Sequence, residues 1–247
     1  MKHIFHVHTI RCGHASEESD EEYVKTAIEL GAEKISFTDH SPFPGNTFGN
    51  RMNIEELPSY IASLNSLKNK YAGKIDIEIG LEIEYLPSQD SFYRELQEKY
   101  GLNLLIIGQH FYEHSDGHYS FNDDKEFNKE NEFIGCGNAI IEGCKTVFFN
   151  VVAHPDRIFR RCKTWTPQME EISLKIIDVA AKNHILLEKN LSSYEKFVNN
   201  SSFIYWRKEF WDLVEKYNLA STIKVNTIVG YDAHSTLDMK QKDIYGL

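Results

Sequence analysis

Short hydrophobic runs alternate with helix-like segments along the chain, and this alternation most limits the folds that it can adopt. Seven runs have the length and composition of strands, namely 3–9, 34–40, 75–84, 103–110, 146–154, 184–190 and 221–232. Strands that alternate with helices form a parallel sheet, which is either closed into a barrel or open with helices on both faces. A chain of 247 residues is long enough for one such α/β domain, so we expect residues 1–247 to form a single domain.

Helix signals lie between several of these runs. Ser19 and Glu22 have the spacing of a capping box and precede apolar residues at helical spacing. Residues 60–71 carry a second amphipathic stripe, and residues 203–218 form another helical pattern. Thr166 followed by Pro167 predicts the start of a further helix, because proline is favoured at the first helical position.

Residues of metal-ligand type stand where the hydrophobic runs end. They are His6, His8, His14, His40, Glu82, His110, His154, Asp232 and His234. Imidazole and carboxylate are ligands of Zn, Mn and Fe, and strand ends on one face of such a barrel are where enzymes of this fold keep their catalytic groups. The sequence therefore predicts a metalloenzyme.

Strand alternation separates these histidines from the other four, because successive side chains point to opposite faces. His6 and His8 share one face of the first run, whereas His3 falls on the other. The remaining histidines begin a run or lie in a polar loop, and they are His184, His114 and His118. We expect these four to be surface or packing histidines.

Composition excludes several other classes of protein. A formal net charge of -10 disfavours broad binding to nucleic acid, whose phosphates require a basic face. The N-terminal residues resemble neither a signal peptide nor a membrane span, so we expect a cytoplasmic protein without a membrane partner. Four scattered cysteines without a C-x-x-C pair indicate reduced thiols. Cys12 is either a packed thiol or a soft metal ligand.

The motifs resemble those of the PHP (polymerase and histidinol phosphatase) metallohydrolases and, within them, the monofunctional histidinol phosphatases. The resemblance runs in the family's motif order from His-Val-His-Thr at 6–9 to Tyr-Asp-Ala-His at 231–234. Two passages are similar to the subfamily, Thr-Asp-His-Ser-Pro-Phe-Pro at 38–44 and Gly-Leu-Glu-Ile-Glu-Tyr-Leu-Pro at 80–87. The resemblance implies a distorted (β/α)7 barrel of the TIM-barrel type, in agreement with the seven runs.

The resemblance also implies three transition metal ions, divalent or of mixed valence, with Zn, Mn and Fe as candidates. It assigns His6, His8, Glu82 and Asp232 to one metal, Glu82, His110 and His154 to a second, and His14, His40 and His234 to a third. Glu82 would bridge two metals, since a carboxylate has two oxygens. Two departures stand out: Tyr231 occupies a position that is usually serine, and the short segment after His234 leaves a closing helix abbreviated or absent.

The implied activity is hydrolysis of L-histidinol phosphate to L-histidinol and inorganic phosphate in histidine biosynthesis. Clustered cations neutralise a phosphate monoester and lower the pKa of bound water, so no side-chain nucleophile is needed. The sequence lacks a G-x-x-x-x-G-K-[ST] phosphate loop. The expected partner is a small phosphate ester, with a homo-oligomer left open. The alternatives are another substrate of a PHP phosphoesterase (a phosphotyrosine protein, a nucleotide or a nucleic-acid end) and a non-catalytic metal-binding module.

Basic residues after His154 are candidates for binding phosphate. The cluster comprises Arg157, Arg160 and Arg161, and Arg11 is a weaker candidate. The planar guanidinium suits phosphate oxygens, and Arg160 matches the position at which the family binds substrate phosphate. Together with Glu82 and Asp232, Arg160 is expected to carry catalysis.

Three acidic or amide residues have open roles. Glu188 and Asn190 resemble the family's E-x-N element, so they either contact substrate, support a ligand histidine or satisfy barrel backbone. Asp156 either supports a ligand, protonates the leaving alkoxide or is a simple loop carboxylate.

Overall fold

Seven parallel strands form a closed barrel in the order of the chain. The computed structural model describes residues 1–199 and 205–245, without the side chains of residues 128–130. The strands are β1 (His3–Val7), β2 (Lys34–Phe37), β3 (Asp76–Ile83), β4 (Leu104–Ile107), β5 (Val151–Val152), β6 (Leu186–Asn190) and β7 (Thr227–Ala233). The predicted barrel is confirmed, with each strand shorter than its hydrophobic run.

Helices follow the strands, as the alternation predicts. They are α1 (Asp20–Glu29), α2 (Leu57–Lys70), α3 (Asp90–Glu98), α4 (Lys125–Lys145), α5 (Pro167–Lys182), α6 (Leu191–Val198), α7 (Lys208–Ala220) and α8 (Thr236–Lys242). The first two residues of the helix expected over 203–218 lie outside the described residues, residues 205–207 are not helical, and α7 begins at Lys208. No helix among residues 1–199 and 205–245 combines the length and apolar composition that a membrane span needs.

Local signals explain where α1 and α5 begin and end. Ser19 and Glu22 form the predicted capping box, and Thr166 accepts a hydrogen bond from the Met169 amide at the start of α5. Helix α1 ends in a Schellman motif at Gly31, whose φ of 75° is strained for any residue with a side chain.

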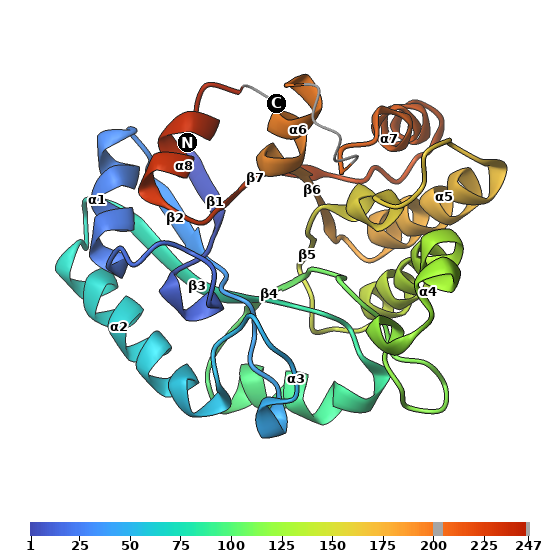
Figure 1. The fold of residues 1–247 in the computed structure, drawn as a ribbon. Coiled ribbons are helices and arrows are strands. Elements are labelled where there is room, and N and C mark those ends of the chain that lie inside the picture. The colour runs from blue at the N-terminus through green and yellow to red at the C-terminus, as the bar shows by residue number, and fades with distance from the viewer. Residues whose placement is uncertain (200–204, 246–247) are drawn as a thin grey trace. The chain divides into compact units, whose positions relative to one another are not determined.

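The chain divides into two compact units. The first comprises Met1–Glu82, Ser91–Ile106 and Val229–Leu247, and the second comprises Ile83–Asp90 and Ile107–Ile228. In the first unit, β1 pairs with β2 and β7, and β2 pairs with β3. Helix α8 lies beside α1, as Figure 1 shows. This arrangement brings the ends of β1, β2, β3 and β7 together.

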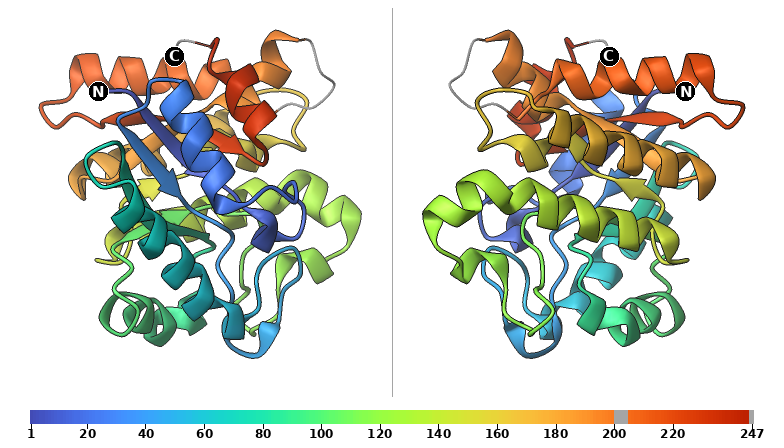
Figure 2. Two further views of the ribbon diagram at one scale, coloured as in Figure 1. Left: turned by 90° about the vertical axis from the view of Figure 1, so that its left-hand side faces the viewer. Right: turned by 90° about the vertical axis from the view of Figure 1, so that its right-hand side faces the viewer.

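In the second unit, α4, α5 and α7 lie in succession, as the right-hand view of Figure 2 shows. Helix α4 contains three glycines, and a Cβ at Gly137 would lie 2.5 Å from Cγ1 of Ile172 in α5. The missing side chain therefore permits this close packing of two helices. After β5, residues Pro155–Phe159 form a short 3-10 turn that carries the basic cluster.

Candidate metal centre

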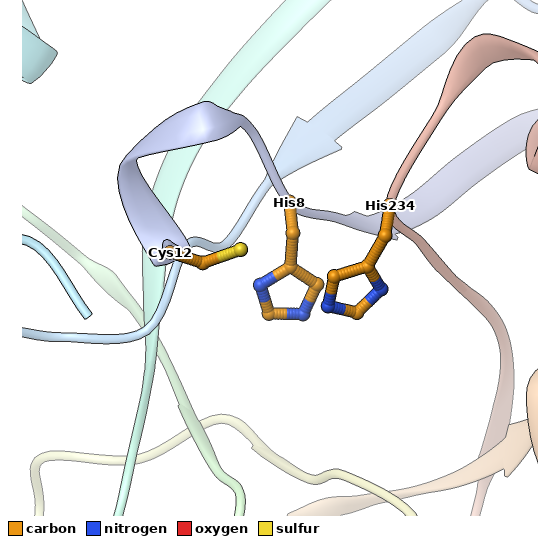
Figure 3. A group of neighbouring side chains, drawn as sticks. All are labelled: His8, Cys12 and His234. Atoms are coloured by element: carbon orange, nitrogen blue, oxygen red, sulfur yellow. The ribbon is translucent and has the colours of Figure 1, made fainter. Parts of the chain in front are cut away.

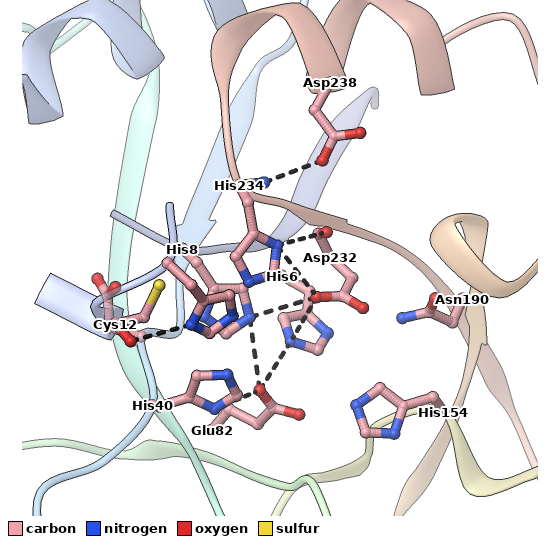
Figure 4. Close-up of polar contacts among 12 residues, drawn as sticks. His6, His8, Cys12, His40, Glu82, His154, Asn190, Asp232, His234 and Asp238 are labelled. Atoms are coloured by element: carbon pink, nitrogen blue, oxygen red, sulfur yellow. Dashed lines mark hydrogen bonds and ion pairs between the residues drawn. The ribbon is translucent and has the colours of Figure 1, made fainter. Parts of the chain in front are cut away.

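Imidazole and carboxylate groups converge at the strand ends of the first unit (Figure 4). Three groups of side chains each have donor atoms within 4.8 Å of one another: His6, His8 and Asp232; His8, His40 and Glu82; and His14, His40 and His234. The last group is the set that the family resemblance assigns to one metal. All seven first-unit residues predicted as ligands are thus brought together.

The Glu82 carboxylate lies at the centre of this cluster. Its Oε2 is 3.4 Å from Nε2 of His6, 3.4 Å from Nε2 of His8 and 3.0 Å from Nδ1 of His40. Oδ1 of Asp232 lies 3.4 Å from Nε2 of His8. Glu82 is 1% exposed, and a carboxylate buried to this extent keeps its charge only where a cation or hydrogen-bond donors compensate it.

The cluster is carried by strained backbone. His6 has a φ of 67° and Asp232 a φ of 48°, values that are rare for residues other than glycine. The register of β1 shifts at His6, so simple alternation does not hold there, although His6 and His8 both reach the cluster. Residues in such conformations gather at functional sites, where the surrounding structure compensates for a cost of about 1–3 kcal/mol each.

Electrostatics keep the cluster in the form that binds metal. Burial and the neighbouring histidines hold the pKa of His8 well below its usual range, and burial also lowers the pKa of His234. Burial opposes ionisation of Asp232, but His6, His8 and His234 hold the pKa of its carboxyl well below its usual range. Neutral imidazoles beside ionised carboxylates are the protonation states that metal ligation requires.

Buried nitrogens without partners indicate that a cation belongs here. Within the described residues, Nδ1 of His8 and Nε2 of His234 are buried and make no hydrogen bond. The ring of His8 stacks on that of His234, with centroids 4.4 Å apart. Buried polar atoms are nearly always satisfied, so the donor set fits transition metal ions that would complete these nitrogens.

Cys12 lies beside the same cluster. Its Sγ points toward the His8 ring (Figure 3), and the donor atoms of His8, Cys12 and His234 lie within 4.8 Å of one another. Burial raises the pKa of the Cys12 thiol to about 11. Because the thiolate is the form that ligates metals, this pKa favours the packed thiol.

His14, Tyr231 and the last helix also belong to the first unit. Nδ1 of His14 lies 3.0 Å from the Cys12 carbonyl oxygen, and its ring lies 4.6 Å from that of His234. Tyr231, in place of the family's usual serine, donates to Oδ1 of Asp243 at 2.8 Å. A short closing helix, α8, is present.

In the second unit, two predicted ligands lie close together, and a carboxylate contacts each of them. The rings of His110 and His154 are 5.3 Å apart. Nδ1 of His110 lies 2.9 Å from Oε1 of the buried Glu84, and the His154 amide, at a residue with φ of 31°, donates to Oε2 of Glu188 at 2.8 Å. Asn190 also donates to Glu188 and caps α6. Of the roles left open for Glu188, this contact favours support of a ligand histidine.

The basic cluster is held by an acidic residue that the sequence did not single out. Glu132 of α4 accepts from Nη2 of Arg160 at 2.6 Å and from Nε of Arg161 at 2.6 Å. The guanidinium of Arg157 lies over the Tyr205 ring, 5.5 Å from its centroid. Glu132 therefore orients two of the three predicted phosphate-binding arginines.

Asp156 anchors the turn that carries these arginines. Its Oδ2 accepts from the Arg207 amide at 2.8 Å and from Nε1 of Trp211 at 3.0 Å, and the Arg207 side chain donates to the Phe159 and Cys162 carbonyls. Burial raises the pKa of Asp156 to about 7. Of the roles left open for Asp156, these contacts favour the loop carboxylate, which here anchors the turn.

Two further findings concern Arg11, a weaker phosphate candidate, and Glu84, which the sequence analysis does not select. The Arg11 guanidinium, a weaker phosphate candidate, forms a fork with Asp20 through contacts of 2.6 and 2.9 Å. Glu84 was not proposed as a functional residue, although it shares a strand face with Glu82. The spacing of two residues between Glu82 and Glu84 on one strand is the sequence signal that could have identified Glu84. Glu132, Arg207 and Trp211 carry no local signal, because their roles depend on tertiary contacts.

Comparisons with known proteins identify the family of this chain. Residues 5–192 match the family model described as PHP domain. A Bacillus subtilis protein named histidinol-phosphatase is 26% identical over 261 residues, covering 95% of this chain and 94% of its own. A Deinococcus radiodurans protein named "Probable histidinol-phosphatase" is 27% identical over 237 residues, covering 93% of this chain and 85% of its own.

A solved structure supports the fold. The histidinol phosphate phosphatase of Lactococcus lactis, in complex with Zn, L-histidinol and phosphate, superimposes with a TM-score of 0.70 at 21% identity. The likeness covers 98% of this chain and 92% of that one. The barrel is thus shared over nearly the whole of both chains.

Proposed function

The chain belongs to the PHP family, and from this membership we propose that it is a histidinol phosphatase, which hydrolyses L-histidinol phosphate to L-histidinol and inorganic phosphate. The observation that carries the proposal is the buried cluster around Glu82, in which histidine nitrogens lie within 3.4 Å of one carboxylate oxygen. The names of the curated relatives support the substrate. We further propose a cytoplasmic biosynthetic role with a small-molecule substrate, which the acidic net charge favours over nucleic acid.

We propose that three divalent transition metal ions bind through the family's ligand sets. His6, His8, Glu82 and Asp232 would bind one, Glu82 with His110 and His154 a second, and His14, His40 and His234 the third. When bound, such ions neutralise phosphate charge and supply a nucleophilic water near neutral pH. The P–O bond to the histidinol oxygen would break, the water oxygen would form the new bond to phosphorus, and one proton of that water would pass to the histidinol oxygen.

The protein's own side chains bind the ester and position the ligands. Arg160 has five N–H donors, of which Glu132 accepts two within the described residues, so the others are available to phosphate oxygens. Glu84 fixes the ring of His110, and Glu188 fixes the backbone of His154. Asp156 anchors the arginine-bearing turn through Arg207 and Trp211.

The proposal is tested by measuring kcat/KM with the metal-replete protein on several phosphate esters in parallel. The substrates are L-histidinol phosphate, phosphotyrosine, a nucleoside monophosphate and a 5′-phosphorylated oligonucleotide. We expect kcat/KM to be highest for L-histidinol phosphate by at least about 100-fold, the discrimination that hydrogen-bonded recognition readily supplies. Equal or higher efficiency on another ester would overturn the substrate and leave the metallophosphatase assignment intact. No activity on any ester would overturn both.

A further inference from the structure

A second group of histidines and carboxylates lies in the loop between β4 and α4, which also contains His110, one of the proposed catalytic ligands. Glu113 and Tyr119 form an antiparallel bridge, and the His114 amide donates to the His118 carbonyl at 2.8 Å. This small hairpin places both imidazoles on one side. Their rings stack with centroids 4.0 Å apart and planes 16° from parallel.

One carboxylate contacts both rings. Nε2 of His114 lies 2.9 Å from Oδ2 of Asp123, and Nε2 of His118 lies 2.9 Å from Oδ1 of the same residue. The Asp123 side chain is 8% exposed, so the hairpin largely shields it from solvent. Two imidazole nitrogens and a carboxylate thus point at one place from the hairpin and from the residues just before α4.

The second nitrogen of His118 is also in contact with a carboxylate. Its Nδ1 lies 2.6 Å from Oδ1 of Asp116. A neutral imidazole has a single N–H, so it can donate to the oxygen of Asp116 or to that of Asp123 but not to both. Either the ring is protonated or a cation lies on its Nε2 side.

We propose that His114, His118 and Asp123 form an additional site for a single transition metal ion of the Zn²⁺ class. With Zn–N bonds of about 2.0–2.1 Å, the ligand atoms of a tetrahedral ion lie about 3.3 Å apart. The nitrogen-to-oxygen distances here are 2.9 Å, so the Asp123 carboxylate would move slightly away from both rings when an ion binds. Asp116 acts as the carboxylate that orients a ligating histidine through its other nitrogen. His118 is about half exposed, which leaves room for water to complete the ion's coordination.

The site would connect the hairpin to the start of α4. Asp123 immediately precedes Asp124, whose side chain caps α4 by accepting from the amides of Glu126 and Phe127. A bound ion would therefore fix residues 113–119 against the N-terminus of the helix that carries Glu132. The site stands on contacts of the second unit alone and does not depend on the proposed substrate.

The test is a Zn²⁺ titration of the full-length protein after removal of metal with a chelator, with bound zinc counted by elemental analysis. We expect Asp123→Asn and His118→Gln each to bind one Zn²⁺ fewer than the unsubstituted protein, or to bind that ion at least 10-fold more weakly. His184→Asn, at an exposed histidine outside the cluster, is the matched control and should bind the full number. The same difference of one ion should persist when Glu82→Ala is present in every protein.

Proteolysis and NMR give independent readouts of the same site. Zn²⁺ should slow cleavage within residues 113–123 in the unsubstituted protein and shift the imidazole resonances of His114 and His118, and it should do neither in Asp123→Asn. Equal zinc numbers and affinities in the unsubstituted protein and both loop variants would overturn the proposal. So would imidazole resonances that respond to pH and are unchanged by Zn²⁺, because the pair would then bind only a proton.

Discussion

Glu82 and His40 are paired through both backbone and side chain. They form a parallel β-bridge, in which the Glu82 amide donates to the Asp39 carbonyl at 3.0 Å and the Ser41 amide donates to the Glu82 carbonyl at 2.8 Å. Nδ1 of His40 lies 3.0 Å from Oε2 of Glu82. Because the backbone fixes both residues, the imidazole and the carboxylate are oriented before any cation binds.

Glu82→Ala should release metal and abolish activity, because the carboxylate contacts three histidines and is proposed to bind two ions. We expect a loss of more than about 100-fold in kcat/KM, since even residues that only support ligands contribute 10- to 100-fold. Metal content by elemental analysis and steady-state kinetics check both effects.

Glu78→Gln is the matched control on the same strand. The Glu78 carboxylate contacts Ser36 and Lys34, so its substitution should leave metal content unchanged. Full metal content in Glu82→Ala, with native circular dichroism, would contradict the assignment of Glu82 as a ligand.

Glu84→Gln should weaken metal retention without unfolding the protein. The Glu84 carboxylate contacts Nδ1 of His110 at 2.9 Å, and the neutral amide would no longer increase the basicity of that ring. We expect Glu84→Gln to lose its metal at a chelator concentration about 10-fold lower than the unsubstituted protein requires. Glu142→Gln, at an exposed residue of α4, should behave as the unsubstituted protein, and equal retention in both variants would show that Glu84 is not a supporting residue.

The barrel, and the gathering of the candidate ligand residues at strand ends, were predictable because they rest on local patterns. Seven hydrophobic runs with polar ends predict strands, and the capping signals at Ser19 and Thr166 place two helices. Helix α4 was not predicted, because its glycines indicate a loop in isolation. The structure explains them: at Gly135 and Gly137 the absent side chains make room for Tyr112 and Ile172.

The partners of the predicted residues could not be read from the sequence. Arg160 was identified by its position after His154, whereas Glu132 contacts it from 28 residues away in the chain. The sequence leaves three roles open for Asp156, and its donors Arg207 and Trp211 are 51 and 55 residues away. His6 and His8 reach the same cluster as predicted, but the register shift and positive φ at His6 have no clear sequence signature in a histidine.

Arg160→Ala should raise KM for the phosphate ester by about 10-fold or more while leaving metal content unchanged. The guanidinium is proposed to bind phosphate, and a charge-assisted contact of this kind contributes about 1.5–3 kcal/mol. Lys163→Ala, at an exposed basic residue nearby, should keep the unsubstituted KM. If Arg160→Ala also kept the KM of the unsubstituted protein, Arg160 would be a structural partner of Glu132 and would not bind the substrate.

Stability should fall as the pH decreases from about 6.5 to 4, in part because of His3. Burial and the neighbouring Lys34 lower the pKa of His3 to about 4, against the opposing influence of Glu78 and Asp76, and Nε2 of His3 bonds Ser36 at 2.7 Å. Between pH 6.5 and 4, His3 is protonated in the unfolded chain and stays neutral in the folded protein. Its contribution to the free energy of unfolding is therefore complete above pH 6.5 and is lost as the pH falls to 4. We expect about 1–2 kcal/mol from His3 over this range, after allowance for its partial exposure.

The variant His3→Gln separates this contribution from that of the cluster histidines, which are also buried. Glutamine can still donate to Ser36 but does not titrate, so its stability should decline less steeply between pH 6.5 and 4. Urea unfolding of the metal-free proteins at half-unit pH intervals measures the difference, because metal loss at low pH then contributes to neither curve. Parallel curves for the two proteins would mean that His3 takes up its proton equally in the folded and unfolded states, contrary to the burial that this strand face imposes.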